Sequence, residues 1–281
     1  MDMAQQEALV GDLAIPPRPQ VVTVLVEEMG KDEPDLARIS RQISADVGLA
    51  AAMLKAVNSP LYRRERKIST VSQAISLLGL RSVSALATGL VVRHAMGSGG
   101  DAARLERFWD SAEKCALLCS FLARHLHGIA EDEAYTVGLF HDCGIPLLLK
   151  RFPNYREVLI KSNTDRQASS CTSVEDAGVG TNHAVVGYFM ARSWHLAEPM
   201  TKAILHHHDV QVFANGQDLS AATINLVAIV HLAERMHHLS QRAAEDLEWE
   251  RFGAAALAHF GMSEDEFAEL QDDSVRMLKA A

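Results

Sequence analysis

The sequence is poor in cysteine and contains no CxxC pair. Only four cysteines occur among 281 residues, and Cys115 and Cys119 stand four apart, where both would lie on one helix face as small core residues. About half of the residues (48%) are apolar, so a chain of this length buries a sufficient core without disulfides. This composition disfavours disorder, collagen and small secreted scaffolds, and it is typical of the reducing cytosol.

Targeting and membrane signals are also missing from the sequence. The N-terminus lacks the basic and then apolar order of a signal peptide. We find no apolar run that approaches the ~20 residues needed to cross a bilayer. The sequence therefore predicts a cytoplasmic protein with no membrane association, unless a partner recruits it elsewhere.

Basic residues are fewer than acidic residues. The chain has 27 lysines and arginines against 36 aspartates and glutamates, so its formal net charge is −9. A protein of this sign gains nothing from bulk attraction to nucleic acid or to an anionic membrane, and we expect neither as a partner. One local basic cluster contains Arg63, Arg64, Arg66 and Lys67, interrupted by Glu65. This cluster indicates either a solvated loop or a small patch for an anion or a partner.

The alternation of apolar and polar residues that marks a half-buried strand is scarce, whereas helical spacing occurs almost throughout. Apolar residues recur at steps of three and four, as in Leu36, Ile39 and Ile43. Thr70 and Gln73, three apart before an apolar stretch, have the spacing of a helix capping box. The sequence therefore predicts an all-α fold.

The clearest internal boundary is the glycine-rich run at 97–100. Three glycines within four residues destabilise a helix, so we predict two parts. Residues 1–97 would form an N-terminal bundle of about five short helices, and residues 98–281 would form a second helical domain. Within the first part, Gly79 suits a left-handed position at a helix end. The stretch 162–181 is rich in Ser, Thr, Asp and Gly and is expected to be a loop.

The sequence contains 13 histidines, which is a high number, and several of them lie close to acidic residues in the sequence. Neutral imidazole and carboxylate are ligands that divalent metals such as Zn, Fe, Mn and Ni accept. The candidate metal ligands are His141, Asp142, His183, His207, His208 and Glu234. His141 and Asp142 are also the candidate catalytic residues. The residues alone leave a purely structural role open, in which packing and hydrogen bonds hold the imidazoles.

The first half of the chain contains a series of motifs that resembles a known family. These motifs are IPPRPQ at 15–20, LKAVNSPLY at 54–62, QAI at 73–75 and LG at 78–79. In this order and spacing they closely resemble the HDOD family, the HD-related output domains of bacterial signalling proteins, over roughly residues 13–240. The resemblance implies an all-helical fold in which a small N-terminal bundle packs on a C-terminal bundle related to HD phosphohydrolases.

The resemblance to the HD superfamily also implies a set of metal ligands. The matching residues are His141 and Asp142 for the HD pair, His183 for an additional histidine, His207 and His208 for a His-His pair, and Glu234 for the final aspartate. The first histidine of the pattern is missing, because Ser111 stands at its position within FWDSAE. One metal site would therefore lack a ligand, whereas the site that includes the His-His pair keeps every ligand type. We expect one divalent ion (Fe, Mn, Zn, Ni or Mg) rather than two.

Two functions follow from these observations. The first is a signalling protein that regulates through contacts with separate signalling proteins, with little or no catalysis. The missing histidine favours it, as does DVQVF at 209–213, where cyclic-dinucleotide phosphodiesterases of the superfamily have a Gly-Tyr-Pro motif. The alternative is a metal-dependent phosphohydrolase acting on a nucleotide or another phosphate ester. The sequence leaves open whether a nucleotide or phosphate ligand binds, and which oligomeric state the chain adopts.

Overall fold

The structure is a computed structural model that describes residues 13, 15–58, 68–96, 102–214, 218–241 and 246–279. Every regular element in these ranges is helical and none is a strand, which confirms the all-α prediction. The glycine-rich run at 97–100 and the basic cluster at 63–67 lie outside the described residues. The division of the chain at that run stays a prediction.

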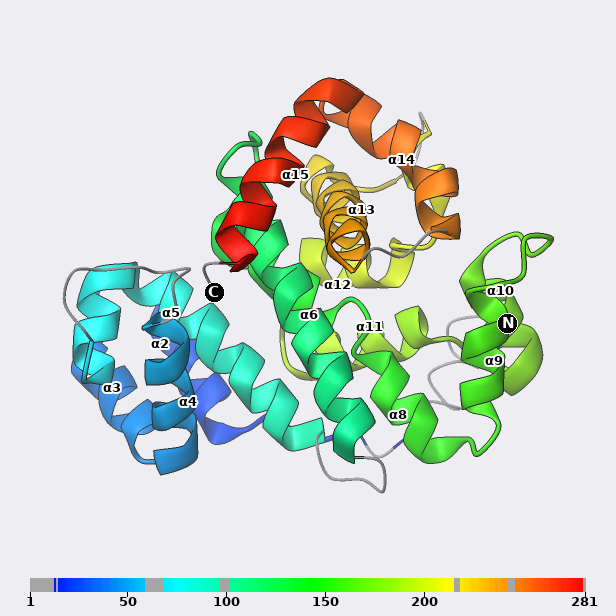
Figure 1. The fold of residues 1–281 in the computed structure, drawn as a ribbon. Helices are drawn as coiled ribbons and strands as arrows, with labels where there is room; N and C mark the ends of the chain where they lie inside the picture. Colours follow the sequence, from blue (N-terminus) through cyan, green and yellow to red (C-terminus); the bar gives the residue numbers. More distant parts are fainter. Residues whose placement is uncertain are drawn as a thin grey trace.

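The described N-terminal part consists of four helices at one end of the molecule (Figure 1). They are α2 (Gln20–Met29), α3 (Leu36–Ser44), α4 (Val47–Val57) and α5 (Val71–Met96). A capping box opens α5, because Gln73 N–H donates to Thr70 Oγ1 while Gln73 Oε1 accepts from the backbone N–H of Thr70. α5 is interrupted at Gly79, whose φ of 81° confirms the positive angle predicted there.

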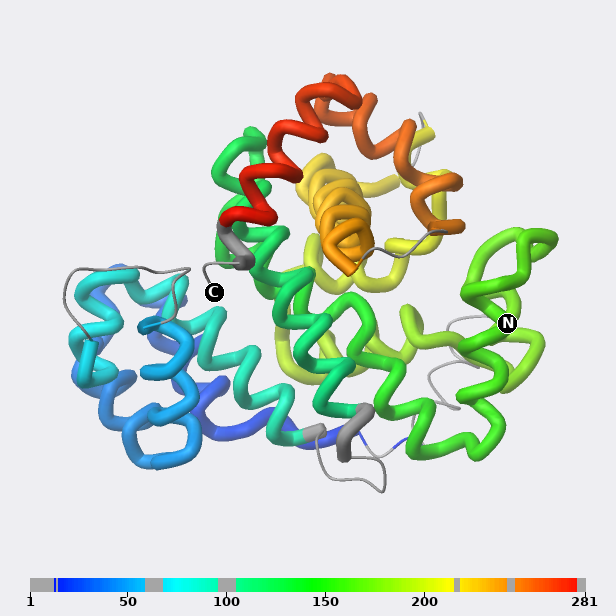
Figure 2. Tube along the Cα trace, viewed as in Figure 1, coloured from blue at the N-terminus to red at the C-terminus, as the bar shows by residue number. Residues whose placement is uncertain are grey.

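The remaining helices form the C-terminal part, in which α13 lies between the other helices and α14 and α15 wrap around it (Figure 2). The helices are α6 (Ala102–Ala123), α7 (Glu131–Phe140), α8 (Gly144–Arg151), α9 (Tyr155–Ser162), α10 (Cys171–Val179), α11 (His183–Ser193), α12 (Glu198–His206), the 3₁₀ turn η2 (Val210–Phe213), α13 (Ala221–Ser240), α14 (Leu247–His259) and α15 (Glu264–Lys279). The expectation of a loop over 162–181 was wrong, because α10 lies inside it. Ser170 and Ser173 form a capping box there, so the polar residues begin a helix.

Hydrophobic contacts join the two parts into one core. A continuous cluster of buried side chains includes Ile39 and Met53 from the N-terminal helices together with Phe140 and Trp194 from the C-terminal ones. Trp194 Nε1 also donates a hydrogen bond to the carbonyl oxygen of Pro16, 3.0 Å away. The proline-rich start of the chain is thereby fixed to the C-terminal part.

One helix departs from the expectation that no segment is long and apolar enough to cross a membrane. By length and composition alone, Val71–Ala95 within α5 meets that requirement. Half of its most apolar window is buried inside the structure, and α5 packs against α3, α4 and α7. A core helix passes the same test, and these contacts make α5 a core helix of the described fold.

Candidate metal centre

The turn between α7 and α8 positions the first two candidate ligands. His141 follows the last residue of α7, and Asp142 lies in the short turn that leads to Gly144 at the start of α8. A Cβ atom on Gly144 would lie only 2.1 Å from the carbonyl oxygen of His183, so only glycine allows this turn to approach the start of α11. This close approach places His183 beside Asp142.

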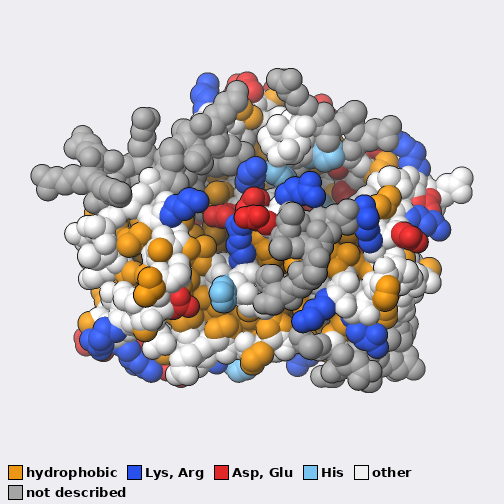
Figure 3. Space-filling model, turned by 60° about the horizontal axis from the view of Figure 1, so that its bottom comes forward, with side chains coloured by type: hydrophobic (Ala, Val, Ile, Leu, Met, Phe, Trp, Pro, Cys, Tyr) orange, Lys and Arg blue, Asp and Glu red, His pale blue; other side chains and the backbone are white. Residues whose placement is uncertain are grey.

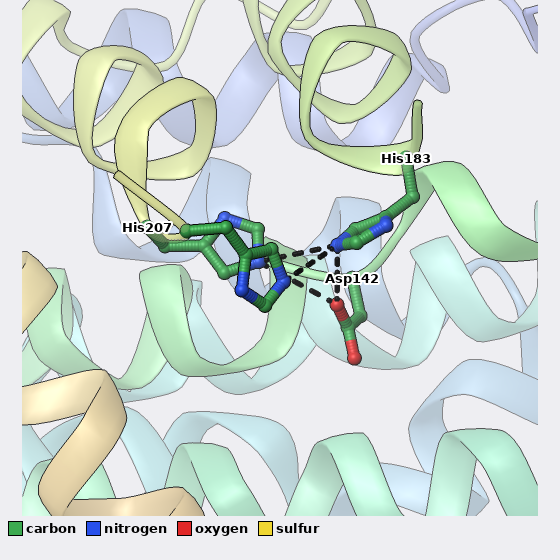
Figure 4. Close-up of side chains that lie close together, drawn as sticks. Asp142, His183 and His207 are labelled. Carbon is green, nitrogen blue, oxygen red and sulfur yellow. Dashed lines mark hydrogen bonds and ion pairs between the residues drawn. The ribbon is translucent and has the colours of Figure 1, made fainter. Parts of the chain in front are cut away.

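The other candidates come from three further segments. His183 begins α11, whose N-terminus is capped by Asn182. The His-His pair follows α12, and Glu234 lies in α13. One potential ligand atom from each of Asp142, His183, His207 and His208 lies within 4.8 Å of the other three, and we call these residues the four-residue cluster. Figure 4 shows the labelled side chains of Asp142, His183 and His207 pointing toward one another.

A second group shares Asp142 with the cluster. His141, Asp142 and Glu234 also offer ligand atoms within 4.8 Å of one another, and we call them the three-residue group. Asp142 Oδ1 lies 3.2 Å from His183 Nε2, and its Oδ2 lies 3.4 Å from His141 Nε2. Oε2 of Glu234 is buried, yet it makes no hydrogen bond with any residue that the structure describes. The carboxylate of Asp142 is therefore placed to bridge two groups of donors.

Hydrogen bonds orient all four histidines in the same way. The Nδ1 atoms lie 2.7–2.8 Å from acceptor oxygens, which are Gly138 O for His141, Glu175 Oε1 for His183, Ile204 O for His207 and Glu248 Oε2 for His208. An Nδ1–H that donates to such an oxygen leaves Nε2 as a lone-pair acceptor. The imidazole Nε2 atoms of the cluster are therefore free to face its centre.

The distances at the centre of the cluster fit a cation. Nε2 of His183 lies 3.0 Å from Nε2 of His208 and 3.3 Å from Nε2 of His207. Lone pairs that face one another at this range repel, unless a proton or a metal ion lies between them. Three imidazole nitrogens and one carboxylate oxygen form a normal ligand set for a divalent metal. The residues present therefore fit the metal that the HD resemblance implies.

Shifted pKa values show how the buried carboxylates and imidazoles of the site offset one another's charge without a metal. Burial opposes protonation of His183, but the carboxylates of Glu175 and Asp142 outweigh it and raise the pKa of His183 to about 9. Asp142 likewise raises the pKa of His141 well above its usual value despite burial. Burial and the neighbouring imidazoles hold the pKa of His208 well below its usual value. A divalent cation in the four-residue cluster would therefore displace the proton held by His183.

Ser111, which the HD resemblance places at the missing histidine, is not buried with the candidate ligands. Ser111 is exposed on α6, whereas Cys115, one helical turn later, is buried and interacts electrostatically with His141 and Glu234. On α6, the side chain near the three-residue group is a thiol rather than a hydroxyl.

Sequence reasoning missed the acids that hold the ligands in place. Glu175 is fully buried in α10 and accepts hydrogen bonds from the backbone N–H of His183 (2.8 Å) and from Tyr155 Oη (3.0 Å), in addition to the bond from His183 Nδ1. Glu248 begins the first turn of α14, 40 residues after His208, which it contacts. No motif marks either glutamate in the sequence, because their partners are set by helix packing.

Comparison with known proteins gives a family match and two curated relatives. The model of the HDOD domain matches residues 15–210. An uncharacterized protein of Treponema pallidum (strain Nichols) is 29% identical over 203 residues, which cover 68% of this chain and 38% of the relative. The uncharacterized protein YuxH of Bacillus subtilis (strain 168) is 36% identical over 59 residues, 21% of this chain and 14% of YuxH. The chain thus matches well under half the length of either relative.

Solved structures share the whole fold at low identity. An HDOD domain protein of unknown function from Geobacter sulfurreducens has a TM-score of 0.76 at 21% identity, with 99% of this chain and 98% of that chain covered. A candidate phosphohydrolase from Shewanella amazonensis SB2B has a TM-score of 0.74 at 20% identity, with 99% and 97% covered. A candidate signal transduction protein from Marinobacter aquaeolei VT8 has a TM-score of 0.69 at 18% identity, with 97% and 59% covered. At these identities the likeness establishes the fold alone.

Proposed function

The chain belongs to the HDOD family, and from that premise we propose that it is a signalling protein that binds one divalent cation and acts through contacts with other proteins. The observation that carries the cation is the convergence of three Nε2 atoms and Asp142 Oδ1 in the four-residue cluster. Each ring is oriented through its Nδ1 atom, as is usual for histidines that bind metals. The cation would hold α11, the end of α12 and the turn after α7 together.

Little or no catalysis is expected from this site. A divalent ion supplies Lewis acidity and lowers the pKa of a bound water, but two-metal phosphohydrolysis requires a second ion ~3.5–4 Å away. The three-residue group offers only one imidazole, His141, besides the carboxylates of Asp142 and Glu234. In the structure His141 Nε2 lies 3.4 Å from both carboxylates, so a protonated His141 already pairs with each of them and offsets part of their charge.

The N-terminal bundle supplies the surface for protein contacts. Of the eight large hydrophobic side chains that are exposed in the described residues, five lie on α2 to α5: Val26, Met29, Leu36, Val47 and Leu77. Val47 is 79% exposed. Figure 3 shows hydrophobic side chains spread over one face of the molecule beside a central group of basic and acidic side chains. The larger share of exposed apolar side chains on this bundle favours it as the part that contacts other proteins.

Elemental analysis of protein purified without chelator tests the proposed cation. We expect at least one divalent metal per chain in the natural sequence, and the loss of about one metal in His207→Ala, which removes one of the four ligands. His206→Ala is the matched control, because His206 is the neighbouring residue and is not one of the four ligands. Absence of metal from the natural protein, even after addition of Zn²⁺, Fe²⁺ or Mn²⁺, would refute this function.

The second candidate function is a metal-dependent phosphohydrolase. The placement of Asp142 between the two groups of donors favours it, because a shared carboxylate is the arrangement that a two-ion site uses. Hydrolysis of a generic phosphodiester with added Mn²⁺ or Fe²⁺ tests this function. Robust turnover that is abolished in His141→Ala and retained in His94→Ala would establish the phosphohydrolase and displace the regulatory proposal.

A further inference from the structure

A third set of potential metal ligands includes the Nδ1 side of His208. Cys171, His208 and Glu248 offer ligand atoms that all lie within 4.8 Å of one another. Cys171 is the first residue of α10 and Glu248 lies in the first turn of α14, so three separate segments meet here. Neither residue belongs to the four-residue cluster or to the three-residue group.

His208 stands between the two sets of donors. Its Nε2 lies 3.0 Å from His183 Nε2 in the four-residue cluster, whereas its Nδ1 lies 2.8 Å from Glu248 Oε2. The two nitrogens of one ring thus face two different groups. A ring placed in this way can serve the four-residue cluster with Nε2 and a second cation with Nδ1.

Burial and the nearby carboxylates raise the pKa of the Cys171 thiol, so the thiol keeps its proton until a cation displaces it. The thiol is 3% exposed and interacts electrostatically with the carboxylates of Glu248 and Glu175. Arg251 Nη1 contacts Oε1 of Glu248 at 3.0 Å, which leaves Oε2 directed at His208. Ligands of a tetrahedral zinc ion lie about 3.5 Å apart, because Zn–ligand bonds are ~2.0–2.3 Å long. Small side-chain rotations are therefore enough to bring the three donors to one ion.

We propose that Cys171, Glu248 and Nδ1 of His208 form a second cation site that takes a thiophilic divalent ion such as Zn²⁺ or Fe²⁺. Binding forms bonds from the ion to Sγ, to a carboxylate oxygen and to Nδ1, and the thiol proton leaves to solvent. The Nδ1 proton moves to Nε2 when Nε2 is free, and leaves to solvent when Nε2 already holds an ion.

This site differs chemically from the four-residue cluster, because only this one contains sulfur. Thiolate selects zinc and iron over magnesium and manganese, whereas imidazole with carboxylate accepts a broader range of metals. Three protein ligands leave one tetrahedral position open for water or for an exogenous donor. The proposal goes beyond the regulatory function, although the two sites share His208.

Cobalt(II) substitution tests the site in the full-length chain. Co²⁺ bound to a thiolate gives an intense sulfur-to-metal charge-transfer absorption in the near ultraviolet, which imidazole and carboxylate ligands do not give. We expect this absorption in the natural protein, with its loss in Cys171→Ser and a marked weakening in Glu248→Gln. Cys115→Ser is the matched control, because Cys115 is also buried but interacts with His141 and Glu234 instead. Circular dichroism identifies any variant that fails to fold, and Glu248→Gln decides the matter if Cys171→Ser does not fold.

Three results would overturn the proposal. Bound cobalt without the sulfur absorption would mean that the four-residue cluster binds metal and Cys171 does not, which leaves the proposed function intact. Loss of the absorption in Cys115→Ser, with retention in Cys171→Ser, would assign the thiolate to the three-residue group. No bound cobalt in the natural protein would refute this site and the proposed function together.

Discussion

The N-terminal bundle and the C-terminal part both bury ionisable side chains, but the hydrogen-bond and charge partners of these side chains differ between the two parts. Glu28 in α2 is fully buried, and its carboxylate accepts hydrogen bonds from Lys31 Nζ at 2.7 Å, from the backbone N–H of Asp35 at 2.9 Å and from Arg38. These contacts lower its pKa to about 2. The charge of Glu28 is therefore matched within the bundle, and a structural role accounts for it.

The histidines of the four-residue cluster show the opposite pattern. Their Nδ1 atoms are satisfied, while their Nε2 atoms converge at 3.0–3.3 Å with too few protons to satisfy them all. Unsatisfied buried acceptors are costly, so a proton or a cation between these nitrogens would stabilise the cluster. Burial of charge alone therefore does not indicate a site. A set of buried lone pairs that converge on one point is a stronger indication of a cation site.

The substitution with the largest expected effect on the histidine cluster is Asp142→Asn. Asp142 is shared by the four-residue cluster and the three-residue group, so its loss should abolish the retention of Mn²⁺. Mn²⁺ is the metal for this test, because the sulfur-containing site does not select it. The natural protein should gain about 2.7 kcal/mol of unfolding free energy when the free metal concentration is 100 times its Kd. Thermal unfolding with and without metal should show that gain in the natural protein and none in Asp142→Asn. Asp110→Asn, at an exposed aspartate on α6, should retain the full gain. A metal-dependent gain that survives in Asp142→Asn would contradict the assignment.

A smaller effect is expected from Glu175→Gln. Glu175 acts through His183, whose Nδ1 it orients, and loss of such an outer partner typically weakens metal affinity by ~10–100-fold. Competition against a coloured chelator would measure the change. Glu157→Gln, at an exposed glutamate of α9, should leave the affinity unchanged. Equal affinities for Glu175→Gln and the natural protein would show that packing, rather than the carboxylate, orients His183.

Much of the fold was predictable, because its signals are local. Helical spacing, the capping box at Thr70 and Gln73 and the positive φ of Gly79 each depend on a few neighbouring residues. α10 was missed because serine promotes both loops and helix N-termini, and only the hydrogen bond from Ser173 N–H to Ser170 Oγ separates the two. The composition of the segment could not distinguish a loop from a helix N-terminus.

The convergence of the candidate ligands was predictable, whereas the residues around them were not. All six candidate ligands fall into two adjacent groups of donors, because the HD pattern fixes their identity and order. The turn of α6 that faces His141 was not predictable, since Ser111 and Cys115 lie on the same helix and only packing decides which is buried. Contacts such as that of His208 with Glu248 join residues 40 positions apart, and no spacing rule reaches that far.

In the N-terminal bundle, Glu28→Gln should reduce stability in a pH-dependent way. The folded pKa of Glu28 is about 2 and its ordinary value is 4.5, so its charge stabilises the fold above pH 4.5. This stabilisation decreases as the pH falls from 4.5 toward 2. Urea unfolding should therefore show a lower midpoint for Glu28→Gln than for the natural protein at pH 7, and a smaller difference at pH 3. Glu27→Gln, at the exposed neighbour that also pairs with Arg38, should change the midpoint little. A difference that is constant with pH would show that Glu28 contributes by packing.

The smallest expected effect is that of Asn58→Ala, at the residue that follows α4. The Asn58 side chain holds both ends of the segment between α4 and α5, because its Nδ2 donates to Leu54 O and Ile68 O at 2.7 Å and its Oδ1 accepts from the backbone N–H of Ile68 at 2.8 Å. Asn58 is exposed, so water replaces part of these bonds and the expected loss is about 1 kcal/mol of unfolding free energy. Asn163→Ala is the matched control, because Asn163 also follows a helix and no side-chain hydrogen bond to a described residue is recorded for it. Metal retention should be unchanged in both variants, since Asn58 lies in the N-terminal bundle. A loss of metal in Asn58→Ala would show that the two parts are coupled more tightly than their shared core indicates.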